Sequence, residues 1–126
     1  MLDPLAIYTV LPAADLERAR LFYSEKLGLE PTMHKPGMLA YSGPPGYIFQ
    51  LYETAEAGTA HNTQMGFNTY DLDTDMAELR ARGVAFEEYD VPGLKTVDGV
   101  GLVGTERSAW FKDSEGNTIC VSESIG

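Results

Sequence analysis

Few residues of this 126-residue chain have side chains suited to nucleophilic, acid–base or metal chemistry. There is one cysteine, Cys120, and there are two histidines, His34 and His61. A cysteine nucleophile needs a base beside it and a lowered pKa, and the sequence places no histidine next to Cys120. Neither histidine has a second imidazole or carboxylate at ligand spacing, so we interpret both as exposed or hydrogen-bonded. A lone cysteine within a strand is commonly a small buried apolar side chain, which is the interpretation we favour for Cys120.

Aromatic and amide side chains give the stronger indication of a function. Ile48, Gln50 and Tyr52 alternate along one apolar run, so in a strand they would share a face, and we expect Tyr8 to share it from a neighbouring strand. A pocket of tyrosines, neutral amides and the single tryptophan, Trp110, suits a flat, partly apolar molecule. The same aromatics could instead fill the core, and the sequence leaves both interpretations open.

The overall charge argues against some classes of partner. Nine Lys and Arg stand against nineteen Asp and Glu, for a formal net charge of −10. Nucleic acids and anionic membranes attract clustered positive charge, which this sequence lacks, so we predict neither as a partner. The first residues lack the basic and apolar regions of a signal peptide, and no apolar run reaches the length of a membrane span. A single cysteine allows no internal disulfide, which favours a reducing, cytoplasmic location.

The first half of the chain is predicted to contain a strand, a helix and three more strands. The helix has apolar residues at helical spacing, Asp15 as its N-cap and Gly28 as its C-terminal stop. The strands are expected at 6–11, 30–34, 39–42 and 47–53.

The second half repeats this order after a small, polar linker. A strand is expected at 64–70, followed by a helix that Asp73 can cap and Gly83 ends. Further strands are expected at 84–89, 108–112 and 118–122, the last two joined by a turn at 113–117.

A Gly-rich loop at 91–104 lengthens the second half. Gly99, Gly101 and Gly104 have the spacing of a phosphate-binding motif but follow no strand-to-helix turn, so we interpret them as a flexible loop. Loops of this length are often lids over a site, and plain linkage is an equal alternative. Lys95 in this loop either meets an anionic ligand or is simply solvated, and solvation is the simpler interpretation.

The repeat defines the expected architecture. Asp71 follows Asp15 by 56 positions, and Gly83 follows Gly28 by 55. We therefore predict an α+β fold, in which two βαβββ modules at about 5–54 and 63–124 flank a linker at about 55–62 within one domain, 1–126. The two modules should form a cupped mixed β-sheet whose concave face is the natural ligand site.

Three stretches of the chain resemble one known family. They are the first helix with its Phe22-Tyr23 pair and Leu27-Gly28 exit, the second helix and its exit at 77–84, and the hairpin at 110–117. In this order and spacing they are similar to the vicinal oxygen chelate superfamily, which includes glyoxalase I, bleomycin-resistance proteins and extradiol dioxygenases.

The resemblance implies four metal-ligand positions, two from each module. These positions lie seven residues before Asp15 and Asp71, where they hold Tyr8 and Gln64, and on the last strands, where they hold Gln50 and Cys120. In the family the usual ligands are histidine and glutamate. These four side chains carry no permanent negative charge for a divalent cation, so we predict no metal and no cofactor. Without a metal ion, we do not expect the metal-dependent reactions of the family.

We therefore predict a metal-free small-molecule binding protein, similar to the antibiotic-binding members of the superfamily. Its pocket is predicted to contain Tyr8, Gln50, Tyr52, Gln64, Trp110 and Cys120. The alternatives are an isomerase, lyase or dioxygenase with an atypical site, and a structural or regulatory interaction protein. The resemblance also implies a homodimer, and the sequence leaves open whether modules pair within one chain or between two.

Overall fold

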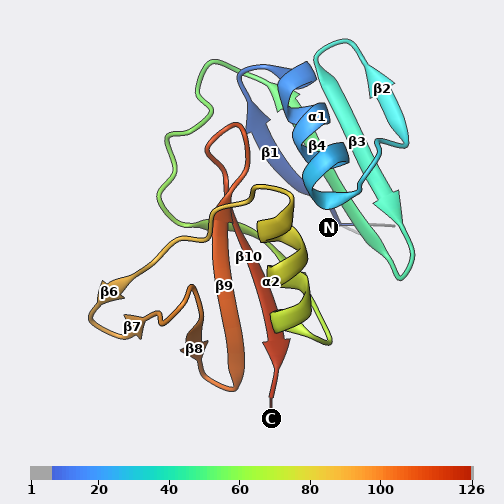
Figure 1. Cartoon of the computed structure of the whole chain (residues 1–126). Helices are drawn as coiled ribbons and strands as arrows, with labels where there is room; N and C mark the ends of the chain where they lie inside the picture. Colours follow the sequence, from blue (N-terminus) through green and yellow to red (C-terminus); the bar gives the residue numbers. More distant parts are fainter. Residues whose placement is uncertain (1–6, 126) are drawn as a thin grey trace, which may run out of the picture.

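Residues 7–125 of the computed structural model are described here, and they form two modules with the same order of elements (Figure 1). The first module consists of β1 (Thr9–Ala13), α1 (Leu16–Leu27), β2 (Met33–Lys35), β3 (Met38–Gly43) and β4 (Tyr47–Glu53). The second consists of β5 (Thr63–Asn68), α2 (Leu72–Ala81), β6 (Asp90–Val91), β7 (Leu94–Lys95), β8 (Gly101–Val103), β9 (Glu106–Lys112) and β10 (Thr118–Ser124). The predicted α+β class and the duplicated βαβββ order are confirmed, with β6 and β7 as an added short pair.

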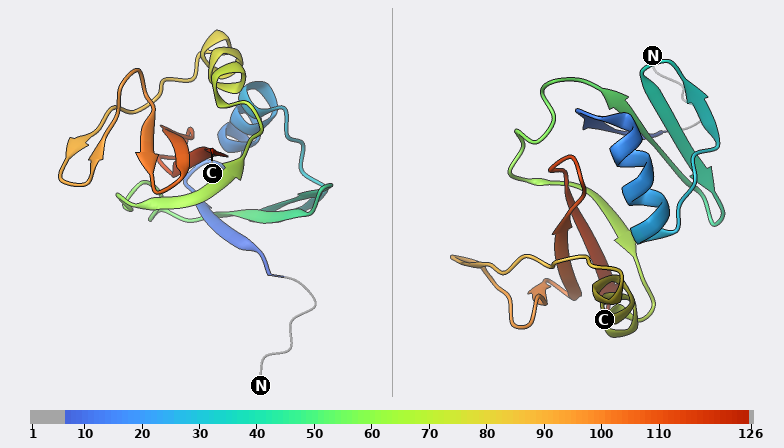
Figure 2. Two further views of the ribbon diagram at one scale, coloured as in Figure 1. Left: turned by 90° about the horizontal axis from the view of Figure 1, so that it is seen from below. Right: turned by 45° about the horizontal axis from the view of Figure 1, so that its top comes forward.

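Each module has its own four-stranded mixed sheet. The strand orders are β1-β4-β3-β2 and β5-β10-β9-β8, and in both sheets the first strand of the module runs parallel to the last. Within residues 7–125, no strand of one four-stranded sheet pairs with a strand of the other. Both helices lie on the same side of the molecule, above the strands in the left view of Figure 2.

Strand register makes the duplication visible residue by residue. In each sheet three residues lie side by side on the first strand, the last strand and the strand before it. These rows are Val10, Gln50 and Ala40 in the first module, and Gly66, Cys120 and Trp110 in the second. The two rows are therefore structural equivalents that carry different side chains.

Both helices begin at an aspartate whose side chain binds the first turn. The Asp15 carboxylate accepts a hydrogen bond from Arg18 N at 3.0 Å, and that of Asp71 accepts one from Thr74 N at 3.1 Å. The prediction that Asp73 caps the second helix is wrong, because Asp73 lies inside the first turn of α2. Asp71 satisfies the free amide groups that a helix start leaves, as Asp15 does in the first module.

The helix ends also bring the two modules into contact. Helix α1 ends at Gly28, whose φ of 70° is the left-handed conformation that glycine adopts without strain. Lys26 Nζ donates to Arg82 O at 2.6 Å, and Arg82 Nη1 donates to Lys26 O at 3.2 Å. Equivalent positions of the two modules thus bind each other. Neither helix within residues 7–125 is long and apolar enough to cross a membrane.

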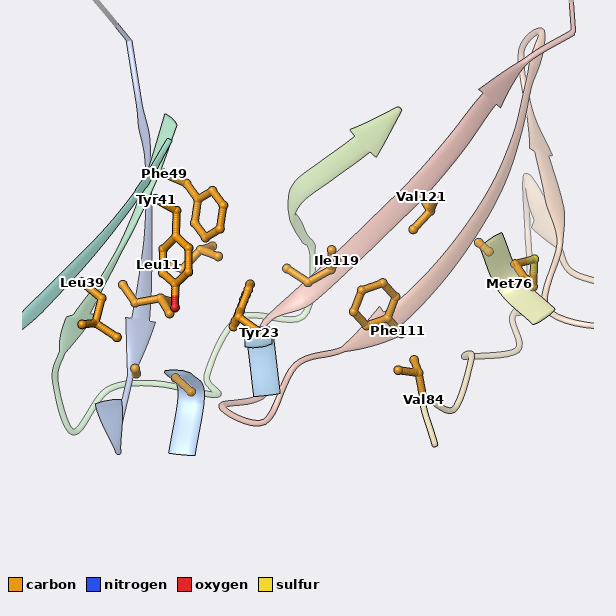
Figure 3. Packing of buried hydrophobic residues seen from close by; sticks show 14 of the residues in the cluster. Leu11, Tyr23, Leu39, Tyr41, Phe49, Met76, Val84, Phe111, Ile119 and Val121 are labelled. Carbon is orange, nitrogen blue, oxygen red and sulfur yellow. The ribbon is translucent and has the colours of Figure 1, made fainter. Parts of the chain in front are cut away.

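The helix-facing side chains of both sheets share one hydrophobic core. Figure 3 shows Tyr23 of α1 between Tyr41 and Phe49 of the first module and Ile119 of the second. The Tyr23 ring lies 5.7 Å from the rings of Tyr41 and Phe49, and its hydroxyl donates to Asp113 at 2.7 Å. One buried aromatic side chain therefore packs on one sheet and binds the hairpin of the other.

The hairpin turn between β9 and β10 fixes the second module to the first. Asn117 Nδ2 donates to Pro12 O and to the Asp113 carboxylate, both at 2.9 Å. The Glu115 side chain, which is fully buried, accepts from Arg18 Nε at 2.8 Å. The turn that the sequence predicts at 113–117 is thus a connection between the modules as well as a turn.

Three predicted segments differ from the structure. The expected strand at 84–89 is reduced to a single bridge between Phe86 and Phe111, because only Glu87 N, bonded to Trp110 O at 2.7 Å, continues the pairing. The expected flexible loop at 91–104 contains part of β6, the whole of β7 and β8. The first strand starts at Thr9, and residue 6 of its predicted range lies outside the described residues.

Candidate ligand-binding faces

The face of each sheet that points away from the helices carries most of the predicted site residues. We call the side of the first sheet that holds Gln50 and Tyr52 the first outer face. The side of the second sheet that holds Cys120 and Trp110 is the second outer face. Alternation puts the neighbours of these residues, such as Phe49 and Phe111, into the helix-side core.

On the second outer face, the Trp110 indole lies across β10. The Cα atoms of Trp110 on β9 and Cys120 on β10 are cross-strand partners, whereas the indole Nε1 donates to Thr63 Oγ1 on β5 at 3.0 Å. The ring must therefore extend over β10, on the side where Cys120 points. Cys120 is 9% exposed, and its Sγ lies 3.2 Å from Ser122 Oγ. A ligand on this face would meet the indole before it met the thiol.

The segment after α2 packs against the same indole. The Tyr89 ring meets the Trp110 ring edge-on, with centroids 5.5 Å apart and planes at 80°. A Cβ placed on Gly101 would lie 2.9 Å from Leu94 Cδ1 and 3.3 Å from Thr96 Cγ2, so these two side chains lie over β8. Burial is the main cause that raises the pKa of the Tyr89 hydroxyl, and the charge of Glu87 raises it further, so the phenol is neutral near neutral pH.

The first outer face is open by comparison. Gln50 is half-buried between Val10 and Ala40, and Tyr52 lies beside Pro12 and Met38. The side chains of Val10, Ile48 and Tyr52 are 47%, 41% and 41% exposed. Tyr8, 51% exposed, immediately precedes β1. Gln50 and Tyr52 thus share one face of the sheet, as their alternation predicts, and Tyr8 lies just before its first strand.

Gln64 differs from the other predicted site residues, because both polar atoms of its side chain are hydrogen-bonded within the protein. It occupies the irregularity in the β5–β10 register, where Thr118 pairs with Thr63 and Ile119 with Met65. Its Nε2 donates to Asn117 Oδ1 at 3.0 Å, and its Oε1 accepts from Thr118 N at 2.9 Å. Both ends of the amide are therefore engaged by the hairpin.

The four family metal positions do not fit a divalent cation. Gln64 has its oxygen committed to the Thr118 amide, and Cys120 lies beneath an indole. Tyr8 and Gln50 belong to the other sheet, and neither brings a fixed charge. Among residues 7–125, no group of three or more His, Cys, Asp or Glu side chains is placed to hold a metal ion.

The described part of the chain has one cleft on the helix side and one beside the second outer face, and neither is lined by any of the six predicted site residues. A cleft of about 360 Å³ on the helix side separates the end of α1 from α2, with Leu29, Phe67 and Leu79 in its walls. A second, of about 500 Å³, lies at the Ser122 end of the second outer face and includes Pro45 of the first module. The second cleft continues the outer face that carries Trp110, because Ser122 is two residues from Cys120 on β10.

Comparison with known proteins identifies the family. The model of the Glyoxalase/Bleomycin resistance protein/Dioxygenase superfamily matches residues 6–121. The chain belongs to this superfamily. No curated protein matches the sequence at a significant level.

Several solved structures share this fold over nearly the whole chain. TnmS3, described as an antibiotic binding protein from Streptomyces sp. CB03234, is 25% identical, with a TM-score of 0.67 and 98% of each chain covered. A lactoylglutathione lyase from Agrobacterium tumefaciens is 23% identical, with a TM-score of 0.67 over 96% of this chain and 95% of its own. A superfamily protein from Alicyclobacillus acidocaldarius is 19% identical, with a TM-score of 0.74 over 100% and 96%. Because one fold carries both binding proteins and enzymes, the site itself must decide between them.

Three residues at the second outer face were not found by the sequence analysis. Tyr89, Thr63 and Leu94 contact or border the indole, yet no motif marks them. Tyr89 ends a segment that was expected to be a strand and forms only a single bridge, so strand alternation could not show where its side chain lies. Only the path of the chain through 88–101 brings Tyr89 and Leu94 to Trp110.

Proposed function

We propose that this protein binds a flat, partly apolar small molecule against Trp110 on the second outer face, without a metal ion. The observation that carries the proposal is the aromatic pair of Trp110 and Tyr89 on the face that points away from the core. The indole N–H already has a partner, Thr63, so the apolar ring is what a planar ligand that displaces Tyr89 would meet. The antibiotic-binding description of TnmS3, 25% identical, supports a ligand of this class.

An enzyme of the metal-dependent type has less support. Gln64 is held at both ends by the hairpin, and Cys120 is shielded by the indole, so these positions cannot polarise a substrate oxygen through a metal. Of the two predicted amides, Gln50 is the one whose side chain has no hydrogen bond among the described residues, and it lies on the first outer face. Its amide would supply hydrogen bonds for orientation, as neutral polar groups do in small-molecule sites.

The binding unit is proposed to be a homodimer in a cytoplasmic, reducing environment. The first outer face exposes Val10, Ile48 and Tyr52 together, and contiguous exposed apolar groups commonly mark an interface. In such a dimer the first outer face of one copy would lie against the second outer face of the other, and the two faces together would enclose the ligand. Light scattering at micromolar concentration should give twice the chain mass of 13.8 kDa, and the monomer mass would remove the proposal.

Ligand binding is tested by a calorimetric screen of planar aromatics and antibiotics against the purified protein. We expect at least one compound to bind and to shift the emission of Trp110, the single tryptophan. Trp110→Phe, which keeps a ring but loses the bond to Thr63, should lower the affinity for that compound by about tenfold. Elemental analysis after incubation with Ni, Zn, Fe(II) or Mn and desalting tests the metal-free part. One equivalent of bound metal, lost in a Gln50→Ala variant, would contradict it.

A further inference from the structure

The indole of Trp110 is almost inaccessible although it lies outside the helix-side core. It is 7% exposed, whereas Tyr52 on the first outer face is 41% exposed. Beyond its own sheet the indole meets Tyr89, and Leu94 and Thr96 lie close to it over Gly101, so all three come from the segment 88–101. A planar molecule cannot stack on the indole while this segment stays in place.

One carboxylate links the beginning of the segment to two later residues, in addition to the Val97–Val100 bridge and a bond from Arg80 Nη2 to Asp98 O at 2.9 Å. Glu88 Oε1 accepts from Thr96 Oγ1 and from Gly99 N, both at 2.7 Å. Thr96 N in turn donates to Tyr89 O at 2.8 Å. These bonds tie the end of the segment back to its beginning, and thereby hold Tyr89 beside the indole.

Val100 packs against the core and anchors the end of the segment, whereas the tip of the segment has few contacts. Strands β6 and β7 have two residues each, and they project from the edge of the molecule away from the first module (Figures 1 and 2). Val91 and Val97 are 54% and 66% exposed, so their apolar area is not used. Segments with few buried apolar contacts and exposed hydrogen bonds open at low free-energy cost.

We propose that residues 88–101 form a lid over Trp110, that the Glu88 carboxylate is its latch, and that a planar aromatic ligand reaches the indole when the lid opens. This inference rests on the proposed function, because it concerns access to the same ring. The incoming ligand replaces the edge contact of Tyr89 on Trp110. The lid therefore regulates how fast the ligand enters and selects for molecules able to take the place of a tyrosine ring.

The latch is tested without any ligand through the emission of the single tryptophan. Glu88→Ala removes both hydrogen bonds of the latch. Glu87→Ala is the matched control. It removes the same charge from the neighbouring position, and the Glu87 carboxylate has no hydrogen bond among the described residues. We expect acrylamide to quench Trp110 at least about twofold more strongly in Glu88→Ala than in the wild type, and equally in Glu87→Ala and the wild type. A melting curve confirms that both variants stay folded.

The ligand arm uses 9-aminoacridine, a planar cation suited to the net charge of −10. Stopped-flow mixing should show an association rate constant about tenfold higher for Glu88→Ala, since two hydrogen bonds no longer oppose opening. Unchanged quenching in Glu88→Ala overturns the lid. Raised quenching with an unchanged association rate overturns its control over entry. Raised quenching with no binding to either protein leaves the lid opening intact and counts against the proposed function instead.

Discussion

The two outer faces differ far more than the two modules that carry them. Equivalent residues on the paired strands are Ala40 and Trp110, and, on the first strands, Val10 and Gly66. The first face is open, with a small residue where the second has an indole. In contrast, both modules keep a capping aspartate and a parallel first-to-last strand pair. The scaffold is repeated, whereas the surface available to a ligand is not.

The connection after each helix follows the same division. Residues 28–32 link α1 to β2 directly, while residues 82–100 link α2 to β8 through the lid. A side chain at Gly101 on β8 would contact Leu94 and Thr96 of that connection, which lie over it. The longer connection is therefore packed onto the one outer face that carries the large aromatic residue.

The largest expected effect separates the two faces by stability. Trp110→Ala should lower the free energy of unfolding by about 3–5 kcal/mol, because it leaves a cavity beneath the lid. Tyr52→Ala on the exposed first face should cost less than about 1 kcal/mol. Urea unfolding followed by circular dichroism measures both. Equal losses would mean that the two faces are buried alike, for example by a second copy over the first.

The contact between the modules gives the next effect, through pH. Burial alone would raise the pKa of Glu115, but hydrogen bonds from Arg18, Asp15 N and Ser114 outweigh it and lower the pKa to about 2. A carboxyl whose folded-state pKa is depressed stabilises the fold above its ordinary pKa, and this contribution is lost as the pH falls through the folded value. Glu115→Gln should thus be less stable at pH 7 by about 2 kcal/mol, a difference that shrinks below pH 4.5 and vanishes near pH 2.

A matched control for this titration lies in the first module. Glu53 is exposed at the end of β4, so Glu53→Gln removes a carboxylate from a solvated position. Unfolding free energies of both variants and the wild type should be measured from pH 7 to pH 2. A pH-independent loss in Glu115→Gln would show that the side chain stabilises the hairpin by shape and neutral hydrogen bonds alone.

The sequence predicts the elements well where a local rule decides them. Asp15 and Gly28 mark the ends of α1 because capping depends on neighbouring residues, and the 113–117 turn follows from its own composition. The second cap was misplaced by two residues, because Asp71 and Asp73 are both acceptable caps by local criteria. Long-range pairing with Phe111 decides how much of 84–89 becomes a strand, and this is not visible locally.

The candidate site was only partly predictable for the same reason. Alternation correctly groups Gln50 with Tyr52 on one face, whereas the place of Trp110 was implied only by the family resemblance. The family spacing locates Gln64, but whether its amide is free depends on a hairpin 53 residues away in sequence. The burial of Trp110 depends on the path of the lid, which no periodicity describes. The role of each of these residues in binding stays a prediction.

The smallest expected change in stability makes the sharpest comparison of the faces. Gly66 is exposed on β5, and a Cβ there would come no closer than 3.8 Å to Cys120 O, which is ordinary contact. Its equivalent Val10 shows that this position of the module accepts a branched side chain. Gly66→Val should therefore change the free energy of unfolding by less than about 1 kcal/mol, since strand glycines gain from a side chain that fits.

The new methyl groups would nevertheless occupy the space next to the strand that the indole crosses. If a ligand lies on the second outer face, calorimetry should show its affinity reduced by about tenfold, while Val10→Ala leaves the affinity within about twofold. The opposite pattern, with Val10→Ala harmful and Gly66→Val neutral, would move the binding surface to the first face.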